Sequence, residues 1–378
     1  SGDQTDAAAS TGAGSDSEAT QTDDDDQPAG EAAGDGADWT VMVYVMGDND
    51  LEPFAIQDLL EMSAVGSTDR VNIVALVDRH PAYINEAVGP VEEFEDTRSL
   101  YIGPESIESS SELGELNLGD PETLASFIEA GVSDYPAERY AVVLWNHGAP
   151  WTGMGPDESN GSDILDLAEI NAGFTEGLAR AGLDSIDLIG FDACLMASYE
   201  VATTVADHGD FMLASEELEP GHGWNYEALQ LLVDNPEYSA VDLGQAIIDG
   251  FVGQAQVNNT EEEITLSLLD LRVMGSVEQA LDQLAQPLMA NPIAAAPILA
   301  QARTASLTFG SNPDPTLDSH QIDLGNLVQH LGNADSLLVV PAKQLERALD
   351  QLVVATASGP ATTGATGVSI YFPVFAEH

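Results

Sequence analysis

Seven short apolar runs, separated by segments with helical spacing, constrain the fold more than any other feature of the sequence. The runs are WTVMVYVMG (39–47), VNIVALVD (71–78), YAVVLWNHG (140–148), IDLIGFDAC (186–194), FMLASEE (211–217), ITLSLLDL (264–271) and GVSIYFP (367–373). Apolar runs of this length are typical of strands that are covered on both faces of a sheet. Apolar residues three and four positions apart predict helices at 51–62, 120–131, 164–182 and 195–207. This alternation predicts an α/β fold with a mostly parallel sheet.

Composition divides the chain into two regions. Residues 1–38 are rich in Ser, Thr, Ala, Gly, Gln and Asp and contain no basic and no large apolar residue. We therefore expect a disordered acidic tail or linker there, because such a segment cannot bury apolar surface. Residues 39–378 form the predicted folded domain, in which 81–119 indicate a hairpin and 274–356 a helical subregion.

The charge balance excludes several classes of partner. Sixty-five acidic and nine basic residues give a net charge of −56, which disfavours nucleic acid and anionic membrane surfaces. High salt screens the self-repulsion of such a chain, so we expect a halophilic source and a coat of solvated carboxylates. No apolar run reaches the roughly 18–20 residues of a membrane span. The single cysteine excludes an intramolecular disulfide.

Two of the predicted strands end in reactive side chains. His147 ends the run at 140–148, and Cys194 ends the run at 186–194. The carboxyl ends of parallel strands meet at one edge of a sheet, so an imidazole there can activate the thiol as a nucleophile. The backbone N–H groups of Gly148 and Cys194 are candidates for an oxyanion hole. If Cys194 opens a helix at 195–207, the helix dipole lowers the pKa of its thiol.

Asp192 precedes Cys194 by one strand period, so both side chains can face the same side and the carboxylate can recognise a basic group. Each of these residues also has an ordinary structural explanation. A lone cysteine is more often a small buried apolar residue, a histidine at a strand end is usually a hydrogen-bonded loop residue, and Asp192 can cap the next turn. Asp48 and Asp50 follow the first run and are weak candidates for calcium ligands, or they cap the helix at 51–62.

The sequence resembles the clostripain family of cysteine peptidases, within the caspase-like clan. The matching stretches are WTVMVYVMGDNDLE, LNLGDPETLASFI, YAVVLWNHG, DLIGFDACLMASYEV, EPGHGWNY and GVSIYFP, which cover about 39–373 in order. The resemblance implies a caspase-like α/β/α sandwich and a cysteine endopeptidase that cleaves after Arg or Lys. It also implies that His147 is the general acid/base, Cys194 the nucleophile and Asp192 a residue of the substrate pocket, with Gly148 and Cys194 supplying the oxyanion N–H groups. No cofactor is expected to be required, although some family members depend on calcium.

The sequence departs from the family pattern in two places. Residues 146–179 contain no Arg or Lys, so self-cleavage after a basic residue is not expected in this loop. His222 stands where some relatives have a second acidic pocket residue, and Glu216, Glu217 and Glu219 are candidate substitutes. The chain also ends soon after the last apolar run, which indicates a short or truncated member.

Two other functions remain open at this stage. One is a non-catalytic member of the same fold that binds peptides, and the other is a thiol acyltransferase, because acyl transfer and hydrolysis share a thioester step. For an enzyme of this kind, whether peptidase or acyltransferase, we expect peptide or protein substrates. We also expect a monomer and an extracellular or cell-surface location. The acidic tail would then serve as a spacer, for example in a lipoprotein.

Overall fold

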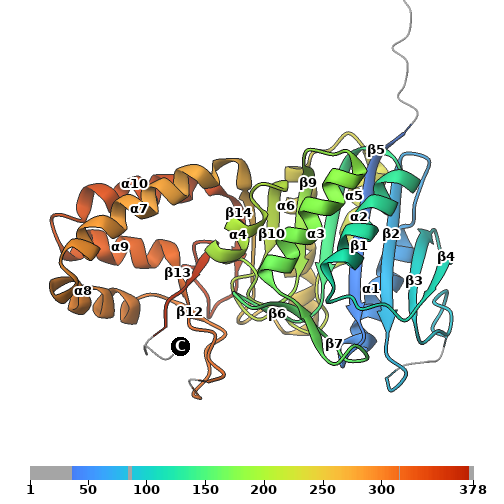
Figure 1. Ribbon diagram of the computed structural model, residues 1–378, viewed down its shortest axis with the longest axis horizontal. Helices are drawn as coiled ribbons and strands as arrows, with labels where there is room; N and C mark the ends of the chain where they lie inside the picture. Colours follow the sequence, from blue (N-terminus) through green and yellow to red (C-terminus); the bar gives the residue numbers. More distant parts are fainter. Residues whose placement is uncertain (1–35, 84–86, 315, 374–378) are drawn as a thin grey trace, which may run out of the picture. The chain divides into compact units, whose positions relative to one another are not determined.

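The computed structural model describes residues 36–83, 87–314 and 316–373, which contain a central sheet of nine strands (Figure 1). Across the sheet the strands are β14 (Val353–Ser358), β11 (Thr265–Asp270), β10 (Gly209–Ala214), β9 (Ile186–Asp192), β5 (Ala137–Trp145), β1 (Ala37–Gly47), β2 (Val71–Arg79), β3 (Thr97–Gly103) and β4 (Ser106–Gly114). The five strands from β10 to β2 are parallel, and the outer strands are antiparallel. The predicted mostly parallel sheet is confirmed, and β3 and β4 form the predicted hairpin.

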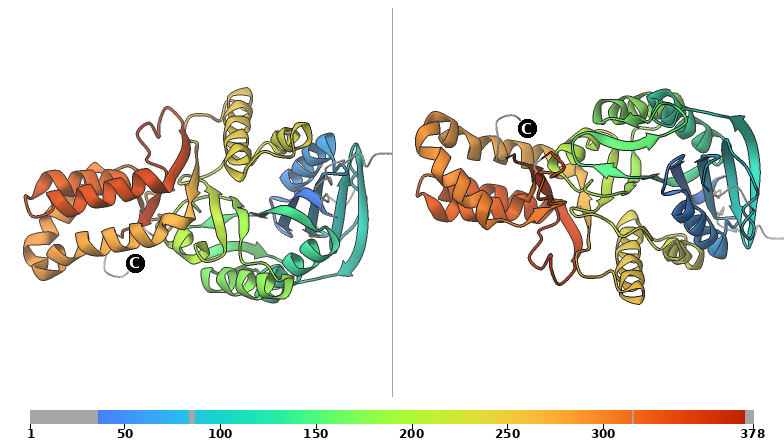
Figure 2. Two further views of the ribbon diagram at one scale, coloured as in Figure 1. Left: turned by 90° about the horizontal axis from the view of Figure 1, so that it is seen from above. Right: turned by 90° about the horizontal axis from the view of Figure 1, so that it is seen from below.

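Helices cover both faces of this sheet, because the central strands are apolar on both sides (Figure 2). Met42, Tyr44 and Met46 of β1 pack in one apolar cluster with α2 (Pro121–Asp134), α3 (Leu167–Ala181) and α4 (Tyr199–Val205). The alternate residues Val41 and Val43 pack on the opposite face. Their cluster includes α1 (Glu52–Val65), α5 (Gln230–Asp234), α6 (Ala240–Asn258) and the 3₁₀ helix at Tyr226–Leu229. The fold is therefore a three-layer α/β/α sandwich.

Side chains at the helix starts explain why several helices begin where they do. Asp120 accepts a hydrogen bond from the N–H of Glu122 and is followed by Pro121, as the sequence indicates for α2. Asp166 and Glu169 form a capping box at the start of α3, and Ser239 and Asp242 do the same for α6.

The chain beyond β11 supplies most of the remaining helices. After a 3₁₀ turn at Leu271–Val273 come α7 (Met274–Ala290), α8 (Pro292–Ala305), α9 (Leu324–Ala334) and α10 (Val339–Leu352). Three short strands form a small sheet: β12 (Thr308–Phe309), β13 (Gln321–Asp323) and β15 (Ser369–Tyr371). Strands β12 and β13 lie between α8 and α9 in the chain, and β15 follows α10. The apolar run at 367–373 therefore contributes to this small sheet, whereas β14, which follows α10 directly, pairs with β11 at the edge of the large one.

The structure corrects the helix that the sequence predicts at 195–207. Helix α4 begins only at Tyr199, with Ser198 as its N-cap. Residues 194–198 instead run as an extended segment beside the residues just after β10. The N–H groups of Leu195 and Ala197 donate to the carbonyls of Glu217 and Ser215. Cys194 therefore does not lie at a helix N-terminus.

The loop after His147 contains a second small sheet, formed by β6 (Gly148–Ala149), β7 (Gly153–Asp157) and β8 (Asp163–Leu165). No helix in the described part of the chain is long and apolar enough to cross a membrane. Most of the acidic tail predicted at 1–38, namely residues 1–35, lies outside the described residues. The last two residues of the predicted tail, Ala37 and Asp38, belong to β1.

A buried ion pair fixes the start of α1 to the end of β2. The guanidinium Nε of Arg79 lies 2.6 Å from the carboxylate of Glu52, and both side chains are fully buried. Arg79 also donates to the carbonyl of Glu92 and lies over the ring of Phe94. These contacts hold the short segment between β1 and α1 in place.

We predict that Arg79→Met lowers the free energy of unfolding by about 3–5 kcal/mol, because it leaves the Glu52 carboxylate buried without its partner. The measurement is urea unfolding in molar salt, followed by tryptophan fluorescence. The double variant Glu52→Gln/Arg79→Met should recover part of the loss. Arg180→Met is the control, since Arg180 pairs with the exposed carboxylates of Glu122 and Glu176 and its loss should matter little. Equal effects of Arg79→Met and Arg180→Met would contradict this role for the buried pair.

Candidate active site

Strand register brings His147 and Cys194 to the same edge of the sheet. β5 and β9 are parallel neighbours, and their last pair is Trp145 with Asp192. His147 and Cys194 each follow this pair by two residues. Both side chains line one pocket of about 250 Å³ at the carboxyl ends of the strands. This is where open α/β sheets place their sites.

Cys194 is partly buried, and its sulfur accepts a hydrogen bond from the N–H of Glu219 at 3.3 Å. Burial raises the pKa of the thiol above its ordinary value, and the carboxylates of Glu217 and Asp192 raise it further, although the hydrogen bond from Glu219 opposes this shift. The expectation of a pKa lowered by a helix N-terminus is wrong, because α4 begins five residues further along the chain.

His147 forms a hydrogen bond that the sequence did not predict. Its Nε2 lies 3.0 Å from Oδ1 of Asp50, and both side chains are exposed to solvent. The preceding Asn146 accepts from the backbone N–H of His147 and also from Asn49, whose Nδ2 bonds the carbonyl of Pro156 as well. The segment that carries the imidazole is therefore fixed by the loop between β1 and α1.

Gly148 packs directly against the backbone of Cys194. A Cβ at this position would lie 2.1 Å from the carbonyl oxygen of Cys194, a distance that no side chain tolerates. The two candidate oxyanion residues therefore lie side by side, and only glycine fits at position 148.

Asp192 lies at the base of the same pocket and is almost fully buried. It accepts hydrogen bonds from the hydroxyl of Tyr226 at 2.9 Å and from the N–H of Trp224 at 3.2 Å. Burial raises its pKa to about 6, while hydrogen bonds from Glu219, Tyr226 and Trp224 limit the rise. These donors orient the carboxylate, and Gly223 passes directly over it.

Glu219 is the second acidic residue of the pocket. Its Oε1 accepts from Nε1 of Trp224 at 3.4 Å, and burial together with the Asp192 charge raises its pKa well above the ordinary range. Of the other candidates, Glu217 accepts from the N–H of Gly310 and Glu216 from the N–H of Gly367, outside the pocket. His222 does not line the pocket either, because its ring bonds the carbonyl of Gly223 and the hydroxyl of Thr260.

A third carboxylate beneath the pocket escaped the sequence analysis. Asp58 of α1 is buried, and its Oδ2 accepts from Nε1 of Trp145 at 2.7 Å. Burial, followed by the charges of Asp192 and Glu61, raises its pKa well above normal. The sequence feature that could have identified Asp58 as buried is its position between Ile56 and Leu59 on the apolar face of the predicted helix. Among the described residues, none of the ion pairs includes Asp58, Asp192 or Glu219.

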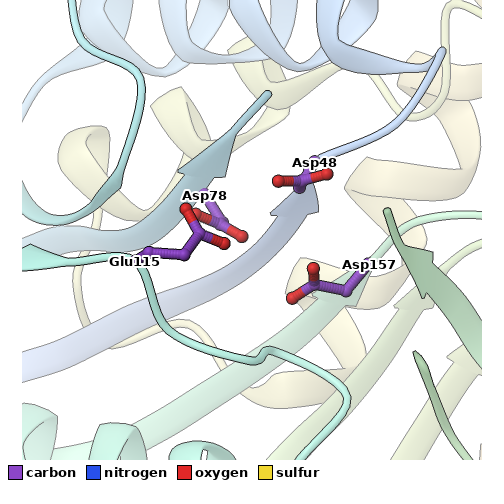
Figure 3. A group of neighbouring side chains, drawn as sticks. All are labelled: Asp48, Asp78, Glu115 and Asp157. Atoms are coloured by element: carbon purple, nitrogen blue, oxygen red, sulfur yellow. The ribbon is translucent and has the colours of Figure 1, made fainter. Parts of the chain in front are cut away.

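The two calcium candidates separate in the structure. Asp50 pairs with His147, whereas Asp48 lies in a group with Asp78, Glu115 and Asp157 (Figure 3). The sequence analysis singled out Asp48 but not Asp78, Glu115 or Asp157, because the four residues come from four separate segments.

Fold and site together define a caspase-like α/β protein in which a thiol and an imidazole share a pocket with buried carboxylates. The sequence model of the Clostripain family matches residues 43–369, and the chain belongs to this family. It is 30% identical over 221 residues to clostripain of Hathewaya histolytica, in an alignment that spans 50% of this chain but only 41% of that protein.

Two solved structures have the same fold. A secreted C11 cysteine protease from Bacteroides thetaiotaomicron, in complex with an irreversible peptide inhibitor, aligns with a TM-score of 0.67 and 20% identity, covering 90% of this chain and 94% of that one. An inactive zymogen C11 protease from Parabacteroides distasonis aligns with a TM-score of 0.63 and 19% identity, covering 89% and 92%. At these identities the likeness concerns the fold.

We predict that alkylation of Cys194 in the folded protein without substrate continues to accelerate with pH beyond the midpoint seen for the urea-unfolded chain. A raised pKa keeps the thiol protonated, so the reactive thiolate forms only at higher pH. The measurement is the iodoacetamide reaction rate against pH, followed by mass, which is unambiguous because the chain has one cysteine. A rate plateau between about pH 6 and 8 would instead indicate a preformed thiolate–imidazolium pair.

Proposed function

We propose that this protein is a cysteine endopeptidase that cleaves after Arg or Lys through His147 and Cys194. The observation that carries the proposal is that His147, Cys194 and Asp192 line a single pocket. Family membership supports peptide-bond hydrolysis as the chemistry, and the buried carboxylates support a basic residue before the cleaved bond.

In the proposed mechanism, substrate binding excludes water and brings the reacting groups together. His147 takes the proton of the Cys194 thiol, and the sulfur attacks the peptide carbonyl. The N–H groups of Gly148 and Cys194 stabilise the negative oxygen of the tetrahedral intermediate. His147 then gives its proton to the departing amine, which leaves a thioester on Cys194. A water molecule, deprotonated by His147, hydrolyses the thioester and restores the thiol.

His147 needs an orientation in which one ring nitrogen faces the sulfur. The hydrogen bond between Asp50 and Nε2 supplies a fixed contact on the solvent side of the ring. Asp50 is therefore a positioning residue in this proposal, since it acts through the imidazole. Its exposure means that salt and water weaken the contact.

The proposed specificity follows from the protonation of the acidic pair. Burial raises the pKa of Asp192 to about 6 and that of Glu219 well above its ordinary range, and in this proposal the pair shares one proton and carries one negative charge. A buried single charge without a basic partner in the described chain favours a ligand with one positive charge. The guanidinium of Arg or the ammonium of Lys has this charge.

We further propose that the enzyme works as an uncut chain or is cut at a basic site by another protease, and does not cut itself after His147. The segment after His147 contains no Arg or Lys up to residue 179, and a pocket built on Asp192 disfavours acidic and neutral side chains. Several of its residues are tied to other segments, as when Asn160 donates to the carbonyl of Leu116 and Ser159 to Asp48.

The proposed setting is an extracellular or cell-surface location at high salt, with the enzyme acting as a monomer. The net charge of −56 supports the salt requirement. One structural relative is a secreted protease, which supports export. Anchoring through the acidic tail stays a prediction from the sequence.

We predict that Cys194→Ala abolishes peptide hydrolysis and that His147→Ala lowers kcat by at least about 100-fold, the usual contribution of a general acid/base. Both changes should leave the circular dichroism spectrum unchanged. In molar salt, a thiol-reactive peptide inhibitor that ends in Arg should add one equivalent of mass to wild type and none to Cys194→Ala. The mass spectra of the labelled proteins also show whether the chain is intact. Wild-type turnover by Cys194→Ala would rule out the mechanism, and product formation only with an added amine would indicate acyl transfer.

We predict that Asp192→Asn reduces kcat/KM for cleavage after Arg about 10–150-fold more than for cleavage after a neutral residue. The basis is a charge-assisted hydrogen bond of about 1.5–3 kcal/mol. Glu219→Gln should retain the preference for Arg, because a neutral amide replaces a carboxyl that is already protonated. Asp187→Asn is the matched control, since Asp187 lies on the same strand and accepts from the N–H of Tyr140 outside the pocket. Equal losses on both substrates for Asp192→Asn would make this carboxylate structural.

A further inference from the structure

A pair of aromatic rings lies at the surface beside the catalytic segment but outside the pocket. Of the four tryptophans, all of which lie in the described ranges, only Trp151 is exposed: it is 50% exposed, whereas the other three are at most 4% exposed. Its ring packs on that of Tyr371, with the centroids 5.3 Å apart and the planes tilted by 49°. A single exposed apolar side chain is ordinary, but these two rings form a joint surface, which we call the aromatic platform.

The hairpin that carries Trp151 begins at the glycine of the proposed oxyanion hole. Strand β6 starts at Gly148 and pairs antiparallel with β7, and Trp151 lies in the turn between them. The N–H of Gly155 donates to the carbonyl of His147, and Met154 of β7 is buried. Trp151 follows Gly148 by three residues, so their Cα atoms are at most about 11 Å apart. The hairpin therefore holds the indole ring within reach of the reacting groups.

The segment that follows Cys194 supports the platform from the other side. The hydroxyl of buried Ser198 donates to the carbonyl of Pro150, in the turn of the hairpin, at 3.1 Å. Ser198 also forms a parallel bridge with Ser369 of β15, and Tyr371 lies two residues further along this strand. Both rings are thus attached to segments that start at the catalytic residues.

The pocket and the platform open toward different layers of the sandwich. Trp145 lines the pocket and belongs to the apolar cluster that includes α1 and α6. Met154 of β7 and Ile370 of β15 pack in the cluster that includes α2 and α3. Cys194 lies at the edge of the sheet between the two layers. A peptide with one side chain in the pocket therefore reaches the platform by crossing this edge.

We propose that Trp151 and Tyr371 bind the side chain that follows the cleaved bond, and that they favour a large apolar or aromatic residue there. This inference rests on the proposed function, in which the basic side chain before the bond occupies the pocket of Asp192. The cleaved carbonyl then lies at the N–H groups of Gly148 and Cys194. The Cα of the next residue is about 3.8 Å further along the peptide, on the side of Cys194 where the hairpin lies.

The chemistry of the two rings sets the class of side chain. Aromatic rings prefer other aromatic rings in offset or edge-to-face contact, and any apolar side chain gains by removing their exposed faces from water. High salt screens the charge of an ionised side chain but leaves such apolar contacts intact. A cation over a ring is the other interaction that a tryptophan favours, so the experiment includes a basic residue at this place.

The first test uses peptides that are identical up to Arg and differ only in the next residue, which is Phe, Leu, Lys, Gly or Asp. In molar salt, kcat/KM of the wild type should be about 3–10-fold higher for the Phe and Leu peptides than for the Gly peptide. Trp151→Ala should remove most of this preference, and Trp151→Phe should retain part of it. Ile164→Ala is the matched control and should keep the full preference, since Ile164 is 41% exposed in the same small sheet.

A second substrate separates the platform from the rest of the active site. A peptidyl-Arg methyl ester has no residue after the reacting bond. Trp151→Ala should therefore lower kcat/KM for the Phe peptide about 3–10-fold more than for this ester. Equal losses on both substrates would mean that Trp151 supports the fold of the site and does not contact the substrate.

The third test measures binding without turnover. In Cys194→Ala, the Phe peptide should protect the tryptophan emission from quenching by acrylamide, because Trp151 is the exposed tryptophan. A peptide that ends at Arg should protect it much less. Cys194→Ala/Trp151→Phe should show no protection with either peptide. Unchanged quenching of Cys194→Ala at a saturating concentration of the Phe peptide would overturn the proposal.

The remaining outcomes separate this proposal from the proposed function. If the wild type hydrolyses neither the peptides nor the ester, the proposed function is wrong, and the quenching measurement still decides whether a peptide covers Trp151. If it hydrolyses them with the same order of preference as Trp151→Ala, only the platform is wrong. A preference for Lys over Phe that Trp151→Ala removes would overturn the assigned class of side chain. If Trp151→Ala does not fold, Trp151→Phe and the quenching measurement decide.

Discussion

The parallel pairing of β5 with β9 is the constraint on which the site depends. It sets Trp145 beside Asp192, and therefore fixes how far His147 and Cys194 extend beyond the sheet. Trp145 bonds Asp58 on one face, while Asp192 is held by Tyr226 and Trp224 from the segment after β10. A shift of one residue in this register would turn each side chain to the other face and separate the thiol from the acidic pocket.

The second theme is how a chain with few basic residues accommodates buried negative charge. Arg79 neutralises Glu52 within the core. Burial raises the pKa of both Asp192 and Glu219, which favours the neutral form of these carboxyls at the base of the pocket. The group around Asp48 has no basic partner among the described residues; burial raises the pKa of Asp78 to about 8, and two buried oxygens of the group have no hydrogen-bond partner. The three sites illustrate one rule, that a buried carboxylate is costly unless a cation, a proton or hydrogen-bond donors compensate its charge.

The sequence could predict the parts of the site that follow from strand order. Apolar runs located β5 and β9, and their ends located His147, Cys194 and Asp192. It could not choose Glu219 over Glu217 or His222, because the segment after β10 has no regular period and its side-chain directions depend on single backbone angles. The helix at 195–207 was misplaced because Leu195 is apolar at helical spacing, yet it takes a positive φ of 65°. Asp78, Glu115 and Asp157 could not be distinguished among 65 acidic residues, since only folding brings them together.

The net charge of −56 has a kinetic consequence for the proposed recognition of basic side chains by the pocket. At low ionic strength, a field of this sign would draw positively charged peptides toward the whole surface and accelerate their encounter with the enzyme. At about 1 M salt the Debye length falls to about 3 Å, so a peptide would feel the charge of Asp192 only after its side chain had entered the pocket. At high salt, substrate specificity would then depend on direct contacts and shape complementarity, and long-range electrostatic attraction would contribute little to the association rate.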